Sequence, residues 1–585
     1  MSLISLSKLL LLFSLALSLF SSSKENSFVA VVEACSDVLV TPGASSKGDA
    51  MIGYNADDPA LYGVLYHYPP TTNNNEDDNV DVYDWDTGKY LGEIPQVNET
   101  FNVVGNGNEY GLVIGESTFG GVEELAAQPG AIIDYGSLIY LTLQRAKTAR
   151  TAIKTMVELM DTYGYASEGE SISIADAIGE VWIMEVIGRG PTYSKMGAVW
   201  VARRVPDGMV TAHANQARIT TFPRDDPENC LYSEDVVDVA VHYGLYPEHS
   251  NVSDFSFSDV YNPIAFSGAR FSEARVWSMF SQIADTDGSF QMEYQDYAAG
   301  RNLNKRMPLF IQPYKKLSVS DVMDLMNSHY EGTELDATMD VGSGLFADVH
   351  RPRPLQWDYK GKMYFNERTI ATERTGWNFV AQIRPNLPRE LATLIWFAVD
   401  DSSTAPRVPV YASSTTIALP YEGKGTQQGV AGKLMKLDMS KAFWVQNMVS
   451  NLAYSRWDDA YPIVRSRIDE IHAKFQSQVD ETDNTALAVY HSTSAAAAVE
   501  VVTNFSVLAG EKLHKEWLDF YGELFVRFRD FSTIEAEPDN TRCGCSVQQP
   551  GLTDRNKKRI VKETGSHYEV PHEDTRIGFD VESIY

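Results

Sequence analysis

The sequence predicts an α+β protein with a helical region appended near its carboxyl-terminal end. Short apolar runs bounded by glycine and proline indicate strands at both ends of the first 429 residues. Between them, apolar residues recur at three- to four-residue spacing over residues 138–164, which predicts a helix that packs on a sheet. After residue 429 the composition shifts toward helix formers. With 585 residues, 44% of them hydrophobic, the chain can bury a core larger than that of one ordinary domain.

The first residues have the pattern of a secretory signal. Lys8 precedes an apolar run over residues 9–20, which is shorter than the roughly 20 residues of a membrane span. We expect residues 1–34 to be a signal peptide with a possible propeptide, an uncleaved anchor being the alternative. Cleavage near residues 21–23 and cleavage after Ala34 both fit. No later stretch approaches a span, so we expect a protein that is secreted or lies in the lumen of the secretory or endolysosomal pathway.

The charge argues against one class of partner. With 49 basic and 79 acidic residues the formal net charge is −30, so electrostatic binding to nucleic acid or anionic lipid is not expected. Sequons at Asn98, Asn251 and Asn504 could carry glycans in a secretory host.

Four cysteines are too few for a disulfide scaffold in a chain of this size. Cys543 and Cys545 lack the further cysteines or histidines of a zinc site. We therefore expect either a disulfide with Cys230 or reduced thiols. The fourth cysteine, Cys35, directly follows the expected propeptide.

The predicted elements follow in order along the chain. Residues 36–57 indicate a strand, a Gly/Ser-rich turn and a second strand, and residues 108–121 and 180–190 indicate further strands. The apolar stripe predicts one helix that ends at Gly164. The runs FVAQIR, LATLIWFAV and VPVYAS predict late core strands. We place the core at residues 35–429, a helical region broken near Pro462 and Asp483 at 430–534, and a polar, extended or disordered tail at 535–585.

A cysteine at the start of a mature chain has a use that an internal cysteine lacks. Its α-amine, with a pKa of about 7.7 to 8.0, can accept the proton of its own thiol, whose pKa is about 8.5. Nucleophile and general base then come from one residue, and no catalytic histidine is needed. If processing releases Cys35 as the first residue, its thiolate can attack an amide carbonyl and form a thioester.

Several motifs extend this interpretation. The second predicted strand ends in YNAD, residues 54–57, and is followed in order by NEYGLVIGESTFGG, EVWIMEVIGRG, TAHANQARI and the late run that begins GWNFVAQIR. From Cys35 to about residue 421 the chain thereby resembles the dipeptidase and secernin family of N-terminal-nucleophile hydrolases. The resemblance implies an αββα sandwich, with two stacked sheets between helices, and no metal or organic cofactor.

The resemblance also implies catalytic roles for three residues. Cys35 would be the nucleophile and, through its α-amine, the base. Asp57 would bind and orient that amine, whereas a cap on the turn after the strand is the alternative. Asn215 would donate to the oxyanion of the tetrahedral intermediate. The alternative for Asn215 is an asparagine that satisfies a nearby backbone group.

Four further residues are candidates for substrate binding. Asn55 could line the site or fix the turn. Glu116 and Ser117 could approach the substrate amine and the oxyanion, or could be polar residues of an exposed turn. Tyr54 stands where many relatives carry arginine, and it cannot supply that fixed charge. Arg218 is a candidate replacement, with a surface ion pair as the alternative.

These observations predict a cysteine peptidase that hydrolyses dipeptides or short peptides with a free amino terminus. An amidase for non-peptide amides and a non-enzymatic, secernin-like protein are the alternatives, since the nucleophile does not specify the acyl group. The expected partner is a short peptide, with no nucleic acid and no membrane span after signal removal. The sequence leaves a homo-oligomer open.

Overall fold

The computed structural model describes residues 35–73, 78–126, 128–351, 353–423 and 434–570. The predicted signal peptide and propeptide, residues 1–34, lie outside the described residues. Among the helices of the described ranges, none combines the length and the apolar character needed to cross a bilayer.

A six-stranded antiparallel sheet contains the first predicted strands and the late core strands. Its order is β14 (Val210–His213), β1 (Ser36–Val40), β2 (Ala50–Asp57), β18 (Thr375–Ile383), β19 (Thr393–Val399) and β20 (Val408–Tyr411). The strands predicted within residues 36–57 and in the late runs are therefore confirmed. Because β1 and β2 lie inside this sheet, residues at their ends are held by neighbours on both sides.

A nine-stranded sheet contains the strands predicted from residues 108–121 and 180–190. Its order is β15 (Cys230–Tyr232), β13 (Ala198–Arg204), β12 (Val181–Gly188), β11 (Gly169–Ala175), β10 (Val113–Gly120), β9 (Gly107–Asn108), β8 (Val103–Val104), β3 (Leu65–Tyr68) and β21 (Glu422–Gly423). The remaining strands of the described chain pair as β4 (Thr71–Thr72) with β7 (Glu99–Thr100), β5 (Asn79–Tyr83) with β6 (Tyr90–Pro95), β16 (Gln356–Tyr359) with β17 (Lys362–Phe365), and β22 (Thr533–Ala536) with β23 (Cys545–Gln548).

The helices of the core are short. They are α2 (Glu123–Ala126), α3 (Tyr135–Leu143), α4 (Ala149–Tyr163), α5 (Val236–His242), α6 (Phe257–Tyr261), α7 (Ala274–Ile283), α8 (Ser289–Ala298), α9 (Val319–Leu325) and α10 (Arg389–Ala392). A π-helical turn, η3 (Gly268–Glu273), precedes α7, and 3-10 turns are η1 (Pro42–Ala44), η2 (Val252–Asp254), η4 (Ala337–Met339), η5 (Val341–Ser343) and η7 (Arg529–Phe531).

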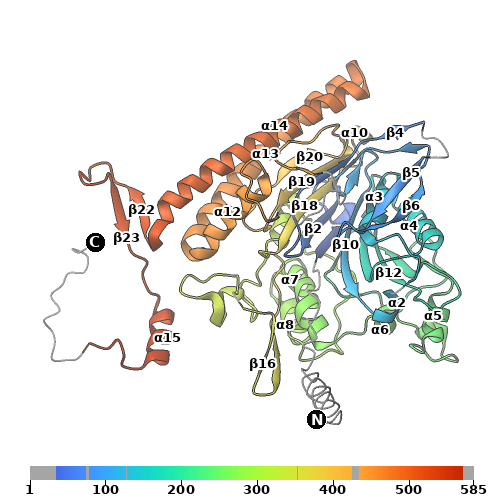
Figure 1. Ribbon diagram of the computed structural model, residues 1–585, viewed down its shortest axis with the longest axis horizontal. Coiled ribbons are helices and arrows are strands. Elements are labelled where there is room, and N and C mark those ends of the chain that lie inside the picture. Colours follow the sequence, from blue (N-terminus) through green and yellow to red (C-terminus); the bar gives the residue numbers. More distant parts are fainter. Residues whose placement is uncertain (1–34, 74–77, 127, 352, 424–433, 571–585) are drawn as a thin grey trace, which may run out of the picture. The chain divides into compact units, whose positions relative to one another are not determined.

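The two large sheets pack face to face. β1 and β2 contact β10, and β2 also contacts β11. Gly115 of β10 lies so close to the opposite sheet that a Cβ there would approach Asp37 Oδ1 to 2.5 Å. Helices α7 and α9 contact the six-stranded sheet, whereas α3 and α4 contact the nine-stranded sheet (Figure 1). The core is therefore layered as helix, sheet, sheet and helix.

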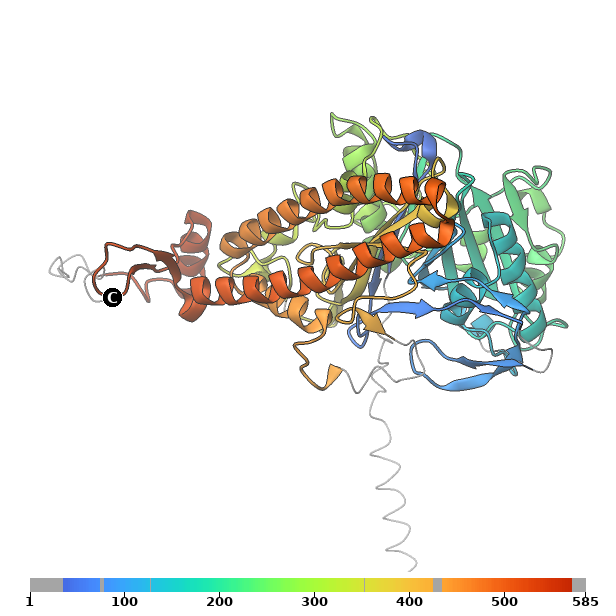
Figure 2. The same cartoon turned by 90° about the horizontal axis from the view of Figure 1, so that it is seen from above.

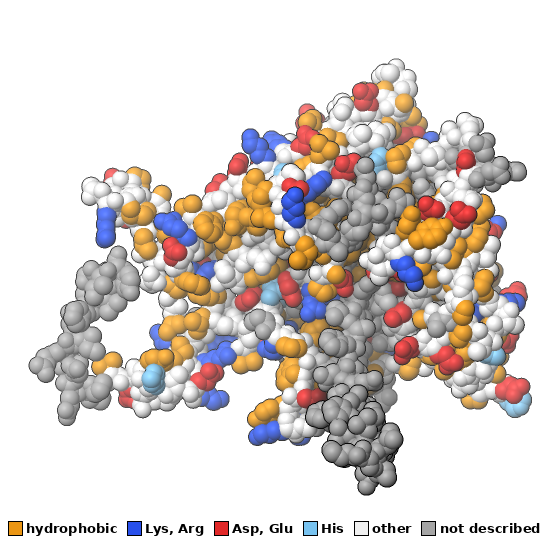
Figure 3. Space-filling model, viewed as in Figure 1, with side chains coloured by type: hydrophobic (Ala, Val, Ile, Leu, Met, Phe, Trp, Pro, Cys, Tyr) orange, Lys and Arg blue, Asp and Glu red, His pale blue; other side chains and the backbone are white. Residues whose placement is uncertain are grey.

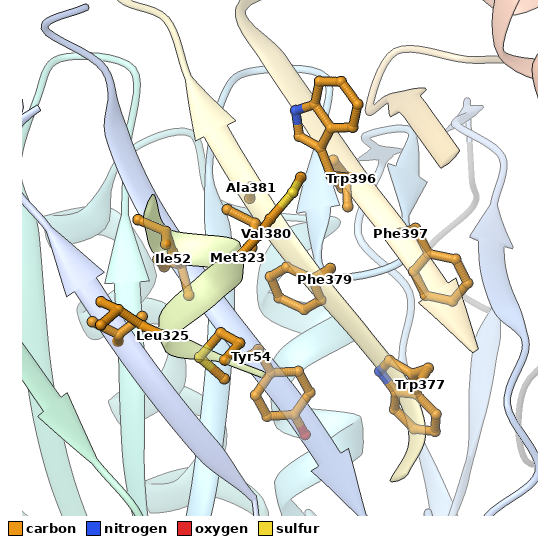
Figure 4. Packing of buried hydrophobic residues seen from close by; sticks show 14 of the residues in the cluster. Ile52, Tyr54, Met323, Leu325, Trp377, Phe379, Val380, Ala381, Trp396 and Phe397 are labelled. Carbon is orange, nitrogen blue, oxygen red and sulfur yellow. The ribbon is translucent and has the colours of Figure 1, made fainter. Parts of the chain in front are cut away.

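Alternation along β2 gives its side chains two environments. Ile52 points toward Gly115 of the other sheet, whereas a Cβ on Gly53 would meet Val322 and Met326 at α9. Figure 4 shows Met323 and Leu325 of this segment lying across the strands that carry Ile52, Tyr54 and Phe379. Residues in register with Ile52, Tyr54 among them, consequently point into the space between the sheets.

The single helix predicted to end at Gly164 is wrong in one respect, because the structure has two helices, α3 and α4. Thr148 is the N-cap of α4, and it forms a reciprocal capping box with Thr151. These bonds satisfy backbone donors at a new helix start, which the apolar spacing alone did not reveal. The predicted end of the helix at Gly164 is confirmed, and this glycine has a φ of 74°.

Long helices follow the core, as predicted. They are α12 (Ala442–Ser455), α13 (Trp457–Ser492) and α14 (Ala495–Phe528). α13 and α14 lie side by side (Figure 2), and α14 also contacts β20. The breaks predicted near Pro462 and Asp483 are wrong, since α13 runs through both positions. Buried residues from Val464 to Ala486 continue along one face of α13, and their packing outweighs the hydrogen bond lost at Pro462.

The polar tail is not extended throughout its described part. β22 pairs with β23, and α15 (Asp554–Thr564) begins at the N-cap Thr553. Cys543 and Cys545 form a disulfide with each other. The expected pairing with Cys230, or reduced thiols, is therefore wrong, because Cys230 is a buried free cysteine of β15 in the core.

Charged side chains of both signs are interspersed on the face shown in Figure 3. Red and blue patches alternate there, although acidic residues outnumber basic ones in the chain as a whole. The face therefore presents no broad basic surface of the kind that follows a phosphate backbone.

Leu513 tests the packing of α14. Leu513 is fully buried, whereas Leu508 on the same helix is 64% exposed. Leu513→Ala should lower the free energy of unfolding by about 2–5 kcal/mol, because it leaves a cavity. The matched control, Leu508→Ala, should cost less than about 0.5 kcal/mol. Denaturant unfolding followed by circular dichroism measures both, and equal losses would contradict the packing of α14.

Candidate active site

Cys35 lies buried where the chain enters β1. The register pairs Asp37 with Tyr54, so alternation places Cys35 on the face of β1 that points toward the other sheet. Cys35 is 6% exposed. Its Sγ lies 3.5 Å from Tyr54 Oη and 3.6 Å from Glu116 Oε1. The thiol is thus enclosed between the sheets, with a hydroxyl and a carboxyl group as neighbours.

Tyr54 bridges the two sheets at this point. Its hydroxyl donates to Glu116 Oε1 at 2.6 Å, and its ring packs on Phe379 with centroids 5.3 Å apart. Glu116 and Ser117 are buried residues of β10, so the interpretation as an exposed turn is wrong. Position 54 therefore holds a neutral donor that touches both the thiol and a carboxyl group.

Burial controls the protonation of this group. Burial, followed by the charges of Glu116 and Asp57, raises the pKa of the Cys35 thiol. Burial also raises the pKa of Glu116 to about 7, against the opposing effect of the hydrogen bond from Tyr54. The thiol is therefore protonated at neutral pH, and nucleophilic chemistry at Cys35 requires a base.

Asp57, at the end of β2, is held by side chains from distant segments. Thr375 Oγ1 donates to its Oδ1 at 2.6 Å, and Arg368 Nη2 lies 3.2 Å from its Oδ2. Burial raises the pKa of Asp57 to about 6, although Arg368 opposes the shift. The turn that follows β2 is capped by Asp58, which accepts from the backbone N–H of Ala60. Asp57 thus serves the space near Cys35 rather than its own turn.

Asn55 points to the opposite face of β2. Its Nδ2 donates to the carbonyl oxygens of Met326 and Ile370 at 3.2 and 3.1 Å, and to Ser402 Oγ at 3.1 Å. These bonds tie the strand to loops on the side of α9. The structure therefore places Asn55 behind the strand that carries Tyr54, and not beside the Cys35 thiol.

Arg275 of α7 joins the segments that carry Cys35 and Asn215. Its Nη1 donates to the Cys35 carbonyl and to Ser36 Oγ, both at 2.9 Å, and its Nη2 donates to Asn215 Oδ1 at 2.8 Å. Asn215 has a left-handed φ of 58°, and its Nδ2 donates to the Thr118 carbonyl. The alternative expected for Asn215, an amide that satisfies a nearby backbone group, is therefore confirmed, because its Nδ2 donates to the Thr118 carbonyl.

A buried chain of hydrogen bonds supports the strand ends. Ser117 Oγ lies 2.6 Å from His213 Nδ1, His213 Nε2 lies 2.7 Å from Ser173 Oγ, and Ser173 Oγ donates to Asp37 Oδ1 at 2.9 Å. Burial lowers the pKa of His213 to about 3, so this imidazole is neutral. Ser117 Oγ also accepts from the backbone N–H of Asn215 at 3.3 Å. Ser117 thereby positions the segment that carries Asn215.

Arg218 belongs to a different buried network. Its Nε lies 3.0 Å from Glu273 Oε1, and its Nη atoms donate to the carbonyl oxygens of Ala212 and Pro308. The alternative of a surface ion pair is wrong, because Arg218 is 4% exposed. The arginine that touches the Cys35 residue is Arg275.

Sequence reasoning missed Arg275, Arg368 and His213. Arg275 stands in the apolar helical stretch ARVWSMFSQI, where a lone arginine signals a buried, paired charge. That signal was available in the sequence. Arg368 lies in a loop before β18 and carries no comparable pattern.

Among the described residues, the histidines and acids with the arrangement of a metal site are His329, His350 and Asp401, and Cys35 is not one of them.

The sequence also matches a known family. Residues 34–470 match the model described as Peptidase family C69. The chain belongs to peptidase family C69. The match begins one residue before Cys35, and it contains every strand of the two large sheets and the start of α13.

Relatives of this C69 peptidase carry dipeptidase names. The chain is 23% identical to the "Probable dipeptidase" of Latilactobacillus sakei, over 73% of this chain and 82% of that protein. It is 24% identical to the "Probable dipeptidase" of Salmonella dublin, over 65% and 81% respectively. It is 23% identical to "Dipeptidase A" of Lactobacillus helveticus, of which it covers 62%. The predicted resemblance to dipeptidases is confirmed.

Glu116→Gln tests the buried carboxyl group. Because burial raises the pKa of Glu116 from 4.5 to about 7, the folded protein binds this proton more tightly than the unfolded chain does. The corresponding stability is present at low pH and is lost as the pH rises through about 7. Glutamine has no proton to lose, so the variant should gain stability relative to the unmodified protein between about pH 5 and about pH 8.

Thermal unfolding at the two pH values measures this difference. Glu168→Gln, at an exposed position just before β11, is the control and should shift stability by less than about 0.5 kcal/mol at either pH. A difference between Glu116→Gln and the unmodified protein that stays constant with pH would contradict the assignment.

Proposed function

We propose that this C69 peptidase is a cysteine dipeptidase in which Cys35 becomes the first residue and acts as the nucleophile. The observation that carries the proposal is the position of Cys35. It lies at the start of β1 between two sheets, with its thiol against Tyr54 and Glu116 and its carbonyl held by Arg275. Two stacked sheets between helices, with a cysteine at this point, are what the resemblance to N-terminal-nucleophile hydrolases implies.

The first half-reaction forms a thioester. The α-amine of Cys35 takes the thiol proton, and the thiolate attacks the carbonyl carbon of the peptide bond. Asn215 donates to the oxyanion of the tetrahedral intermediate. When the intermediate collapses, the C–N bond breaks, and the departing amine receives the proton held by the α-ammonium. The raised pKa of the thiol makes this internal base necessary.

The second half-reaction releases the acid. The α-amine takes a proton from water, hydroxide attacks the thioester carbonyl, and the C–S bond breaks. The thiolate recovers the proton from the α-ammonium, so Cys35 returns to its starting state. Asp57 holds the amine through both steps, and Arg368 keeps that carboxylate in place.

Glu116 is the group we assign to the free amino terminus of a dipeptide. It is the carboxyl group in direct contact with the Cys35 thiol, and an acceptor at that distance suits an ammonium next to the scissile bond. Tyr54 holds Glu116 Oε1 and thereby fixes its direction. A carboxyl group that must bind an α-amine so close to the nucleophile favours short peptides over the interior of long chains.

Processing and location belong to the same proposal. Residues 1–34 direct the chain into the secretory pathway, and their removal exposes Cys35. The family match starts at residue 34, one residue before Cys35, which supports a mature chain that begins at Cys35. The sequons at Asn98, Asn251 and Asn504 are all exposed, as glycosylation requires.

Cys35→Ala tests the nucleophile. The variant should fold normally and lose all dipeptide hydrolysis, because alanine removes the attacking atom. Cys230→Ala is the matched control, since Cys230 is the other buried free cysteine of the described chain, and it should keep full activity. Chromatography of amino acids released from a dipeptide panel measures activity, and intact mass shows whether the purified chain starts at Cys35. Full activity of Cys35→Ala would refute the mechanism.

The same assay separates the alternatives. A chain that starts at Cys35 but cleaves acyl amides in place of dipeptides is an amidase. A purified chain that keeps residues before Cys35 and cleaves nothing is a non-enzymatic protein of this family.

Tyr54→Phe tests the residue that replaces the arginine of relatives. Removing the hydroxyl leaves Glu116 without its donor and the thiol without a neighbour, so kcat/KM should fall about 10- to 100-fold, or about 1.4–2.7 kcal/mol. Tyr66→Phe, at a buried tyrosine that packs on Trp85 and Trp377, is the control and should keep its activity. Unchanged kinetics of Tyr54→Phe would show that the Glu116 contact does not serve catalysis.

A further inference from the structure

Three buried side chains from separate segments meet outside the Cys35 site. His329 follows α9, His350 lies in the loop before β16, and Asp401 follows β19. One ligand atom from each lies within 4.8 Å of the others, and His350 Nε2 is 3.2 Å from Asp401 Oδ2. His329 and Asp401 are fully buried. Two imidazoles and a carboxylate are therefore gathered at one point of the fold.

Each histidine has a carboxylate at its other ring nitrogen. His329 Nδ1 lies 2.9 Å from Glu331 Oε1, and His350 Nδ1 lies 3.4 Å from Asp348 Oδ1. Both pairings leave Nε2 for another partner. His329 Nε2 is buried and has no hydrogen-bond partner among the described residues. A carboxylate hydrogen-bonded behind the imidazole, as Glu331 is behind His329, orients histidine ligands in metal sites, whereas His350 Nδ1 forms no hydrogen bond with Asp348.

Aromatic side chains of the helical region enclose the cluster. The ring of Tyr454 lies 3.9 Å from that of His350, and its hydroxyl donates to Asp401 Oδ2 at 2.8 Å. Trp457 packs edge-on against both histidines, with centroids 5.4 and 6.0 Å away. Aromatic rings thus pack against the two histidines, and the Tyr454 hydroxyl holds Asp401.

An opening and a fourth ligand are present on one side. His350 and Glu373 line the same surface cleft, together with Val349, Arg351 and Thr372. Glu373 Oε2 lies 3.5 Å from His350 Nε2, and its side chain is 46% exposed. An ion can therefore reach the cluster from solvent, and Glu373 or water can complete a four-ligand shell.

We propose that His329, His350 and Asp401 bind one divalent transition metal ion, with Zn²⁺ as the chemical class that fits best. Imidazole nitrogen and carboxylate oxygen are typical zinc ligands, and two histidines with one carboxylate leave a position for a fourth. Hard ions such as Mg²⁺ prefer shells made of oxygen. This site could not be predicted from the sequence, because its ligands are spread over 73 positions from 329 to 401 without a metal-binding spacing.

The ion would join segments that also serve the Cys35 site. Tyr330, next to His329, donates to the Arg368 carbonyl, and Arg368 pairs with Asp57. Ser402, next to Asp401, accepts from Asn55 of β2. Metal binding would therefore stabilise the loops behind β2 and their contact with α12, and its role is structural support at a distance from the thiol.

Metal binding by the purified mature protein tests this site. The protein is stripped with a chelator, titrated with ZnCl₂ in a calorimeter, and assayed for bound zinc by mass spectrometry after desalting. We expect one equivalent of Zn²⁺, no comparable binding of Mg²⁺, and a higher unfolding temperature with zinc. Bound Co²⁺ should give the visible absorption of a site with nitrogen and oxygen ligands.

Variants locate the ion. His350→Gln should weaken Zn²⁺ binding at least about 100-fold, and Glu331→Gln about 10- to 100-fold, because it supports His329. His249→Gln, at an exposed histidine, is the matched control and should bind normally. Cys35→Ala should also keep one equivalent, which separates this site from the thiol and from the proposed peptidase activity.

Two results would overturn the proposal. Absence of bound Zn²⁺ in the folded protein would show that the cluster is a buried ion pair of His350 and Asp401 alone. Stoichiometric binding that survives His350→Gln, or that is lost in Cys35→Ala, would place the ion elsewhere. The Co²⁺ spectrum of the unmodified protein decides the matter even if His350→Gln fails to fold.

Discussion

The geometry of the candidate site depends on the hydrogen bonds that Arg275 donates. Its guanidinium reaches the backbone of Cys35 on one side and the amide of Asn215 on the other, so the segments that carry these two residues are fixed to a single side chain. Burial lowers the pKa of Arg275 to about 10, yet it stays charged at any physiological pH. A buried charge of this kind is retained only when it is well paired, and here its partners are the carbonyl and amide oxygens of the site itself.

The second feature of the site is the tyrosine at position 54. Tyr54 supplies one hydrogen bond to Glu116 and carries no positive charge. Position 54 of β2 therefore places no positive charge beside the Cys35 thiol, and burial keeps the thiol protonated. Under the proposed mechanism, the α-amine of a processed Cys35 is the base that removes this proton.

Much of the fold followed from local patterns, and the failures have physical causes. The strands were predictable because buried strands such as β19 are largely apolar runs between turns. The division of one predicted helix into α3 and α4 could not be predicted in this way, because it depends on the reciprocal capping box of Thr148 and Thr151. The break predicted near Pro462 is wrong because the tertiary packing of α13 outweighs the local tendency of proline to end a helix.

For the site, Cys35, Tyr54, Asp57 and Asn215 were grouped by the resemblance to a known family, which implied their roles. It could not assign the partners. The apolar stretch around Arg275 indicates a buried charge but not its partner, and only the fold separates Arg218, which pairs with Glu273, from Arg275, which binds Cys35. The cluster of His329, His350 and Asp401 depends wholly on tertiary structure, since three loops meet there.

The two buried carboxyl groups near the thiol also set how the site responds to its surroundings. Glu116 and Asp57 become neutral as the pH falls below about 7 and about 6, which removes charge from a region that water does not reach. Over the same range the chain, with a net charge of −30 and an isoelectric point near 4.7, repels itself less. A falling pH therefore removes negative charge from this buried centre, whereas a rising pH adds charge that faces Arg368 at Asp57 and the Tyr54 hydroxyl at Glu116.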